Sequence, residues 1–509
     1  MAETKREIER KYESDDSGLP DLTGVAGVAD VLDKGVAELD ATYYDTPDER
    51  LAAASITLRR RTGGSDAGWH LKFPVAPGVR DEIRAPLSDT LPRGLAGLLR
   101  SRVRDTELVP VVRLRSARDV RELVDAEGRL LAEVSVDAVH AERMNGAGGA
   151  AQWTEIEVEL ADDGDPVFLD KVEKRLRKAG VRPSTSASKL ARALAETAPK
   201  RTGKKGKKRG KAPNEAAAAP LTAGDHLLAY LRAQRDAIVE LDPAVRRDVH
   251  DSVHRMRVAT RRLRSAFRSY ARILDRTVTD PIGEELKWLA GELGVDRDQE
   301  VLTERITQAL DDLPRPLVNG PVRSRLRTWT HARRGGSRRR LIAVLDGKRY
   351  LTLLGTLDAL IADPPLLKAA AGEPAKVIGR AVGKDFGTLS GLIEEALGRP
   401  PGHDRDLALH EARKKAKRTR YAAEAAEPVL GEPATDLVKA AKALQNLLGD
   451  HQDSVMTRTA LREIAAQAHA AGESTFTYGV LYGREEQRAA ADEAELPVLW
   501  EAVKAGTAF

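Results

Sequence analysis

Residues 155–160 read Glu-Ile-Glu-Val-Glu-Leu, and residues 7–11 read Glu-Ile-Glu-Arg-Lys. In both stretches an ionisable side chain occupies every second position, and in the longer one an apolar side chain fills each position between. Successive side chains of a β-strand point to opposite faces. Each stretch therefore predicts a strand with one charged face, and this pattern decides the fold of the first part of the chain.

The same alternation recurs in the segments between these two stretches. The further charged rows are Arg59/Arg61, His70/Lys72, Arg80/Glu82/Arg84, Arg113/Arg115 and Glu133/Ser135/Asp137. A single such strand is most often the solvated side of an antiparallel sheet. A whole series, with acids and bases nearly balanced, favours a closed barrel whose charged rows line one lumen. Such a lumen suits phosphate oxygens on its basic rows and divalent cations on its carboxylate rows.

The composition limits the kinds of site that the chain can carry. There is no cysteine, which excludes disulfides and thiolate metal sites. The 83 basic and 78 acidic residues leave a net charge of only +5, so local arrangement matters more than total charge. No run approaches the roughly 20 apolar residues of a membrane helix, and the charged N-terminus lacks a signal peptide's apolar segment. We therefore expect a soluble, cytoplasmic protein with no membrane partner.

The chain divides into two parts of different periodicity, which predicts an α+β multidomain protein. Residues 1–198 alternate with a period of two, whereas apolar residues of 221–509 recur at three and four positions, as in helices. Residues 199–220 have lysine and alanine runs without apolar periodicity, which predicts a basic, flexible linker.

The helical part contains an internal repeat. The segment Val253–Arg257 (Val-His-Arg-Met-Arg) matches Leu409–Arg413 (Leu-His-Glu-Ala-Arg). Farther on, Leu-Gly at 293–294 followed by Asp298 matches Leu-Gly at 448–449 followed by Asp453, at nearly the same separation. These matches predict two related helical bundles, at about residues 221–364 and 375–509.

The N-terminal motif resembles a known family. Glu-x-Glu-x-Lys at 7–11, followed in order by Arg-x-Arg at 59–61, Leu71-Lys72, the glutamate row at 155–159 and Ser188-Lys189, is similar to the CYTH domain of triphosphate tunnel metalloenzymes. The resemblance covers residues 3 to 197. It implies an eight-stranded antiparallel β tunnel barrel that hydrolyses a triphosphate with Mg²⁺ or Mn²⁺.

This resemblance implies roles for the charged rows. The expected catalytic residues are Glu7, Glu9 and Lys11, with Lys11 orienting the attacking water or acting as its base. Oxygen ligands suit Mg²⁺ or Mn²⁺, and the candidates are Glu7, Glu9, Glu133, Asp137, Glu155 and Glu157. The candidates for binding substrate phosphates are Arg59, Arg61, Lys72, Arg80, Arg84, Arg113, Arg115, Arg118 and Lys189. The roles within the row at 155–159 stay open, because its three glutamates share one face.

Two basic stripes mark the helical part. On helices, His254, Arg257, Arg261 and Arg264 fall on one face, and His410, Arg413, Lys417 and Arg420 repeat the pattern. A solvated face with packed arginine stems is the plain alternative. Like charges on one stripe repel, so its recurrence favours binding of a polyanion. Nucleic acid is less expected, because aromatic stacking residues are missing from the stripes.

The second part also resembles a known family. The histidine–arginine stripe, the Leu-Gly-x-x-Arg-Asp of 293–298 and the second copy around His410 and Asp453 are similar to a CHAD domain, over residues 221 to 505. The resemblance implies binding of inorganic polyphosphate through a basic surface. The second copy departs from the first, with His451-Gln452 in place of Asp296-Arg297, so the two halves need not contribute equally.

Together the two resemblances predict an inorganic triphosphatase or short-polyphosphate hydrolase that is tethered to polyphosphate and located at polyphosphate granules. Two alternatives remain open. One is an enzyme for an organic triphosphate, either a thiamine triphosphatase or an adenylate cyclase. The other is a polyphosphate-binding adaptor without turnover. The sequence leaves the oligomeric state open.

Overall fold

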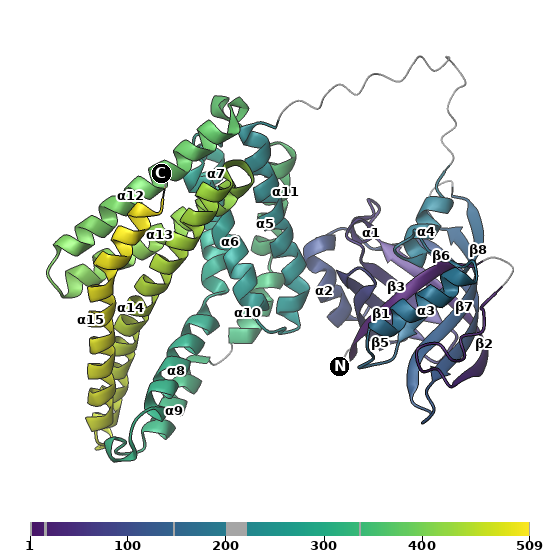
Figure 1. Cartoon of the computed structure of the whole chain (residues 1–509), viewed down its shortest axis with the longest axis horizontal. Helices are drawn as coiled ribbons and strands as arrows, with labels where there is room; N and C mark the ends of the chain where they lie inside the picture. The colour runs from purple at the N-terminus through teal and green to yellow at the C-terminus, as the bar shows by residue number, and fades with distance from the viewer. Residues whose placement is uncertain (1–2, 15–17, 146–147, 200–220, 335–336, 508–509) are drawn as a thin grey trace. The chain divides into compact units, whose positions relative to one another are not determined.

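The computed structural model describes residues 3–14, 18–145, 148–199, 221–334 and 337–507, except for the side chains of 295–298, 333, 334 and 337. The chain divides into two compact units, Met1–Ala212 and Pro213–Phe509 (Figure 1). All but the first residue of the predicted linker at 199–220 lies outside the described residues. Among the described helices, none is long and apolar enough to span a membrane.

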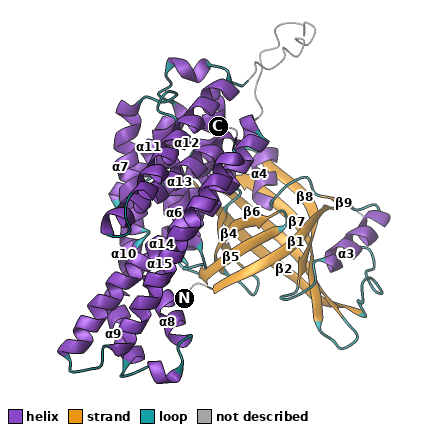
Figure 2. Ribbon diagram, turned by 60° about the vertical axis from the view of Figure 1, so that its left-hand side comes forward, coloured by secondary structure: helices purple, strands orange, loops and turns teal. Residues whose placement is uncertain are grey.

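The first unit is built on a closed antiparallel sheet. Its strands are β1 (Glu3–Glu13), β2 (Asp30–Asp45), β3 (Thr57–Thr62), β4 (Gly68–Ala76), β5 (Val79–Pro86), β6 (Val109–Val124), β7 (Leu130–Arg143) and β8 (Ala150–Leu160). They pair in the order β5-β4-β3-β2-β6-β7-β8-β1, and β1 also pairs with β5, which closes the ring. Figure 2 shows these strands wrapping around one another. The predicted eight-stranded tunnel is thus confirmed, with a short extra strand β9 (Arg182–Pro183) beside β1.

Helices cover the outside of this sheet, and their apolar contacts determine which side chains of each strand face outward. Trp69, Leu71 and Ile83 pack outward against α2 (Arg93–Val103), with the short α1 (Arg50–Ala53) alongside. Val134 and Ile156 pack in the same way against α3 (Val167–Lys178). Because the apolar residues face outward into these small cores, the charged residues between them face the lumen.

A fourth helix, α4 (Lys189–Glu196), closes off part of the lumen. Its Leu190 and Ala193 pack with Ala41, Leu114 and other apolar side chains on the inward face of the sheet. The Ser188 hydroxyl caps the helix by accepting a hydrogen bond from the Ala191 N–H at 3.0 Å. The capped first turn therefore holds Lys189 at the edge of the charged lumen.

The second unit is entirely helical over its described residues, apart from one isolated β-bridge between Leu274 and Leu366. Its α-helices are α5 (Ala223–Arg246), α6 (Ser252–Ser269), α7 (Arg276–Glu292), α8 (Val295–Asp311), α9 (Val322–Arg334), α10 (Ser337–Asp346), α11 (Lys348–Ala362), α12 (Pro374–Gly398), α13 (His403–Leu430), α14 (Glu432–Ala470) and α15 (Phe476–Ala505).

Two apolar cores hold these helices together. The larger core contains residues of α5, α6, α7, α10, α11, α12 and α13, together with the first half of α14 and the end of α15. The smaller joins α8 and α9 to the second half of α14 and the start of α15. Helices of both predicted bundles therefore contribute to the larger core, and α6 packs directly against α13.

Candidate functional site

The tunnel encloses a polar cavity of about 280 Å³. The predicted residues that line it are Glu7, Glu9, Lys11, Arg59, Arg61, Lys72, Arg80, Arg84, Arg118, Glu133, Glu157 and Lys189. They come from β1, β3, β4, β5, β6, β7, β8 and α4, so the closed sheet brings distant parts of the sequence together. Asp137 and Glu155 are buried next to the cavity, where both contact Lys189.

A carboxylate cluster surrounds the ammonium of Lys189. The Nζ atom lies 2.9 Å from Asp137 Oδ2 and 2.7 Å from both Glu155 Oε1 and Glu157 Oε1. Burial lowers the pKa of Lys189, but the three carboxylates outweigh it and raise the pKa above its usual range. This cluster therefore already binds a cation, which is the protein's own lysine.

Lys11 connects the same cluster to the motif at residues 7–11. Its Nζ pairs with Glu157 and lies 3.1 Å from Glu9 Oε1. Burial would raise the pKa of Glu157, but Lys11, Lys189 and Arg118 hold it well below its usual range. Burial likewise lowers the pKa of Lys11, and the neighbouring carboxylates turn the net shift upward. Lys11 thus lies in this cluster as a protonated ammonium that donates to Glu157.

Basic side chains occupy the other side of the cavity. The Arg59 guanidinium donates to the Tyr43 hydroxyl at 3.3 Å, and Lys72 pairs with Glu7. Arg118 donates to Asp137 Oδ1 at 2.8 Å and to Glu157 Oε2 at 2.9 Å, so it joins the two sides. Two further arginines have partners within the protein. Arg80 donates to the backbone oxygens of Ser55 and Ala187, and Arg84 pairs with Glu82.

Two side chains in the cavity carry their charge at a disadvantage. Burial, with help from Glu82 and Glu159, raises the pKa of Glu7 to about 7 even though Lys72 opposes the shift. Burial, followed by repulsion from Arg59 and Arg118, lowers the pKa of Arg61 to about 9. Burial is the main cause of both shifts, since Lys72 pairs with Glu7 and Asp66 pairs with Arg61. A cation bound near Glu7 and an anion bound near Arg61 would each favour the charged form of that side chain.

The donor set fits a hard divalent cation. One oxygen from each of Asp137, Glu155 and Glu157 lies within 4.8 Å of the others. Glu7 and Glu9 add buried carboxylates on the neighbouring strand β1, and no histidine or cysteine ligand belongs to this cluster of described residues. Oxygen ligands of this kind suit Mg²⁺ or Mn²⁺. Because Lys189 lies among three of the oxygens, a divalent cation there would have to displace its ammonium.

Two predicted substrate-binding residues do not lie in the tunnel. Val112 and Leu114 take the inward face of β6, so the alternation turns Arg113 and Arg115 outward. Arg113 pairs there with Asp40 at 2.5 Å, and Arg115 Nε lies 3.9 Å from the same carboxylate. The expectation that these arginines share the lumen is therefore not met, because both the arginines and their partner occupy the outer face.

Several residues of the cavity were not among the sequence candidates. Lys5 and Glu159 line it and pair with each other at 2.7 Å. Their positions, two residues beyond Glu7 and Glu157 on the same faces, were a signal that could have identified them. Asp66, which pairs with Arg61, sits in a glycine- and serine-containing loop, where no periodicity marks it. Tyr43 also lines the cavity, but nothing in the sequence distinguishes it from other apolar residues of its strand.

The second unit brings the two basic stripes together. His254, Arg257, Arg261 and Arg264 lie on α6, and His410, Arg413, Lys417 and Arg420 lie on α13, which packs against α6. Burial, with repulsion from Arg261, Arg413 and Arg257, lowers the pKa of Lys417 to about 7. The cationic residues of both repeat copies therefore lie close enough to repel one another.

Carboxylates lie close to several of these arginines. Glu284 of α7 lies 3.8 Å from Arg264, and Glu424 lies 3.5 Å from Arg420. Asp453 lies at 4.0 Å from Arg413. The His410 Nδ1 lies 2.6 Å from Gln452 Oε1. Lys417 nevertheless feels repulsion from arginines of both helices.

Comparison with known proteins identifies a different domain family in each of the two units. The CYTH domain model matches residues 5–194, and the CHAD domain model matches residues 229–462. The "uncharacterized protein Rv2226" of Mycobacterium tuberculosis is 40% identical over 496 residues, which cover 94% of this chain and 92% of that protein.

Two solved structures are also similar to the chain. PptA from Streptomyces chartreusis is 21% identical, with a TM-score of 0.47 over 55% of this chain and 99% of that one. The CHAD domain from the plant Ricinus communis is 25% identical, with a TM-score of 0.43 over 58% of this chain and 98% of that one. With both domain models matched in order and a relative similar along nearly its whole length, the chain belongs to the family of proteins that join a CYTH domain to a CHAD domain.

Proposed function

We propose that the first unit hydrolyses inorganic triphosphate or short polyphosphate with Mg²⁺ or Mn²⁺, and that the second unit binds polyphosphate. The observation that carries the proposal is a single cavity that brings the carboxylates of Glu7, Glu9 and Glu157 together with the guanidinium groups of Arg59, Arg61 and Arg118. A polyphosphate chain with its divalent cation carries charges that match both sets. A neutral or purely cationic ligand would match at most one set.

The basic side of the cavity would bind and orient the phosphate chain. Arg59, Arg61 and Arg118 are fixed by their partners before a ligand arrives, so their charges need little reorganisation. They would stabilise negative charge on the oxygens of the phosphoryl group being transferred. Lys11, held between Glu9 and Glu157, would donate a hydrogen bond that orients the attacking water.

The carboxylate side would hold the divalent cation. Glu7 and Glu9 line the cavity and are candidate ligands, and Asp137, Glu155 and Glu157 become available if Lys189 moves away. When bound, the cation would neutralise phosphate oxygens and help to activate water. Glu133, which also lines the cavity, would contribute at its edge.

An inorganic chain suits the cavity better than an organic triphosphate. Its apolar and aromatic lining is confined to a few side chains, namely Ala37, Leu39, Tyr43, Val120 and Leu190. The Tyr43 hydroxyl is already engaged by Arg59. A thiamine or adenine ring would need an apolar or stacking surface that the described lining hardly offers.

The basic surface of α6 and α13 would bind the longer polymer. Arg257, Arg261, Arg413 and Lys417 come from both copies of the repeat, and their mutual repulsion would be relieved by a polyanion. Binding of this kind would keep the enzyme near its substrate, including at polyphosphate granules.

Phosphate release from a substrate panel tests the proposal. The panel contains triphosphate, long-chain polyphosphate, thiamine triphosphate and ATP, each with Mg²⁺ or Mn²⁺. We expect the highest kcat/KM for triphosphate, and its loss in Glu7→Gln/Glu9→Gln. Asp40→Asn, which removes a carboxylate from the outer face of the same sheet, is the matched control and should keep activity. Polyphosphate binding without any turnover would instead identify a non-catalytic adaptor, and preference for an organic substrate would exclude the inorganic assignment.

A further inference from the structure

A polar layer separates the two apolar cores of the helical unit. On α14, Leu448 belongs to the larger core and Ala460 to the smaller. On α15, Leu481 belongs to the smaller core and Leu496 to the larger. The residues between these positions on the two helices include charged side chains that belong to neither core.

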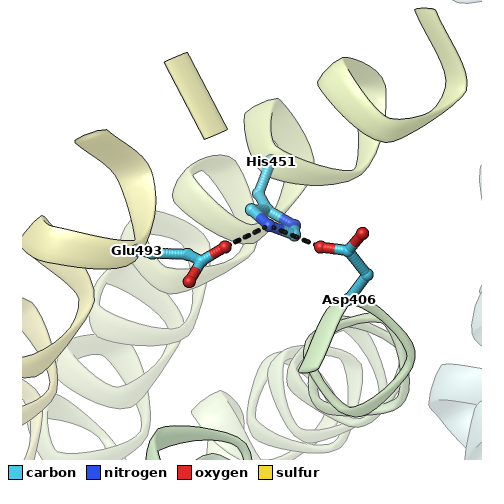
Figure 3. A group of neighbouring side chains, drawn as sticks. All are labelled: Asp406, His451 and Glu493. Atoms are coloured by element: carbon cyan, nitrogen blue, oxygen red, sulfur yellow. Dashed lines mark hydrogen bonds and ion pairs between the residues drawn. The ribbon is translucent and has the colours of Figure 1, made fainter. Parts of the chain in front are cut away.

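Three side chains with metal-binding atoms converge in this layer. Figure 3 shows His451 of α14 between Asp406 of α13 and Glu493 of α15. The His451 Nε2 atom lies 3.3 Å from Asp406 Oδ1 and 3.3 Å from Glu493 Oε1. The imidazole is only 2% exposed, and one ligand atom from each residue lies within 4.8 Å of the others.

Hydrogen bonding alone satisfies this arrangement poorly. Nε2 can carry one proton, which cannot point at two carboxylates at once. Charge-assisted N–H···O⁻ bonds are typically about 2.7–2.9 Å long, whereas both contacts are longer. Ligands bound to Zn²⁺ at about 2.0–2.1 Å in a tetrahedron lie about 3.3 Å apart, which matches both distances.

Two neighbouring arginines orient the two carboxylates, as the hydrogen-bond partners of metal ligands usually do. Arg458 Nη2 lies 3.4 Å from Asp406 Oδ2, and Arg405 Nε lies 3.1 Å from Glu493 Oε2. Each arginine thus engages one oxygen and leaves the other facing the imidazole. These arginines also offset part of the negative charge of the two carboxylates.

We propose that Asp406, His451 and Glu493 form a Zn²⁺ site that joins α13, α14 and α15 between the two apolar cores. A site with three protein ligands keeps an open coordination position, unlike the closed sites of four protein ligands that are typical of structural Zn²⁺. The site differs from the stripes of His254 and His410, where arginines surround the histidines. It is also independent of the hydrolysis proposed for the tunnel.

Metal binding to the full-length, chelator-treated protein tests this proposal. Co²⁺ is the most informative ion, because four-coordinate Co²⁺ with an imidazole ligand absorbs visible light far more strongly than six-coordinate Co²⁺ with oxygen ligands. The absorption therefore separates this site from any cation in the tunnel. We expect a Co²⁺ spectrum of the four-coordinate type that Zn²⁺ bleaches, and Zn²⁺ should raise the Tm of the helical unit.

His451→Gln should abolish both signals, and Asp406→Asn should weaken Zn²⁺ binding by at least tenfold. His469→Gln, which changes an exposed histidine at the end of the same helix, is the matched control and should retain them. Circular dichroism of each variant shows whether the helices are intact. Absence of the four-coordinate spectrum in the wild type, or its persistence in folded His451→Gln, would overturn the proposal.

Discussion

Two glycines occupy equivalent positions in the repeat of the helical unit, and each faces an arginine of a basic stripe. A Cβ atom on Gly294 would lie 2.7 Å from Arg257 Cζ, which is too close for any real contact. A Cβ atom on Gly449 would lie 3.7 Å from the nearest Arg413 atoms, an ordinary distance. Glycine is therefore required for arginine packing in the first copy and merely compatible with it in the second.

This difference predicts unequal effects of the same substitution. Gly294→Ala should push the Arg257 side chain away and weaken long-chain polyphosphate binding several-fold, whereas Gly449→Ala should change the Kd less than twofold. Gly449 lies inside α14, where alanine favours the helix by about 1 kcal/mol, but Gly294 is the N-cap of α8, where glycine is preferred to alanine, so circular dichroism must show that Gly294→Ala keeps its helices. Calorimetric titration of both variants gives the comparison. Equal losses, or none in Gly294→Ala, would show that Arg257 is not positioned by this glycine.

Lys417 gives the basic surface a pH dependence. Its pKa of about 7 reflects burial and three facing arginines, Arg261, Arg413 and Arg257, with Asp453 opposing the shift. A bound polyanion favours the protonated form and raises this pKa, so binding takes up a proton at pH values above 7. Affinity should therefore rise as the pH falls from about 9 to 7, and the contribution of Lys417 should level off below 7.

The matched variant for this prediction is Lys417→Arg, which keeps a positive charge throughout the range. Its Kd for polyphosphate at fixed ionic strength should change much less between pH 9 and 7 than that of the wild type. Parallel pH profiles of the two proteins would assign the titration to other groups, including His254 and His410.

At the scale of elements, α4 supplies a cation to the carboxylate cluster of the tunnel. Lys189→Met keeps similar bulk but leaves Asp137, Glu155 and Glu157 without their ammonium. Removing one partner of a buried ion pair costs about 3–5 kcal/mol. In chelator, the variant should unfold at a lower temperature than the wild type, and Mn²⁺ should raise its Tm more than that of the wild type.

Differential scanning calorimetry with and without Mn²⁺ measures both effects. Lys174→Met, on the exposed side of α3, is the control for loss of a lysine and should behave as the wild type. The same Mn²⁺ shift in Lys189→Met and the wild type would mean that the cation does not enter the cluster held by Lys189.

The strands of the tunnel could be predicted well because alternation is a local property. The rows at 7–11, 80–84 and 155–159 all face the lumen as expected. Alternation alone does not say which of the two faces is inside, and this is why Arg113 and Arg115 were placed in the lumen. Their neighbours Val112 and Leu114 bury against α4 at that end of β6, a tertiary contact that no local pattern encodes.

Periodicity was also less informative about where helices end. The repeat predicts that the Leu-Gly pairs at 293–294 and 448–449 are equivalent, yet the first lies between α7 and α8 and the second lies inside the 39-residue α14. Similarly, residues of the carboxylate cluster were predicted, but the position of Lys189 among them depends on the packing of α4. Such features follow from contacts between distant segments rather than from spacing.

At the scale of the whole molecule, the described apolar cores each belong to one unit. The cores of the tunnel use residues before Glu196, and the two helical cores use residues after Leu221. A domain with its own core can in principle fold alone. The helical unit should behave as one piece rather than two, because helices on both sides of residues 364–375 share its larger core.

The separate cores predict that hydrolysis and polymer binding can be separated. A fragment of residues 1–198 contains the whole cavity lining and should keep kcat for triphosphate within a few-fold of the full chain. It should lose tight binding to long-chain polyphosphate, because Arg257, Arg413 and Lys417 lie in the other unit. A fragment of residues 221–509 should show the reverse, and its affinity should fall steeply with salt, as for other polyanion complexes.

Phosphate-release assays and calorimetry on the two fragments measure these activities separately. Arg257→Ala/Arg413→Ala in the second fragment is the matched variant, since it removes one arginine from each copy of the repeat without touching either apolar core. It should weaken binding and lower the salt dependence together, because fewer cations contact the polymer. If the folded 221–509 fragment does not bind polyphosphate, the helical unit has another role. If residues 1–198 fold but hydrolyse nothing that the full chain hydrolyses, catalysis requires both units.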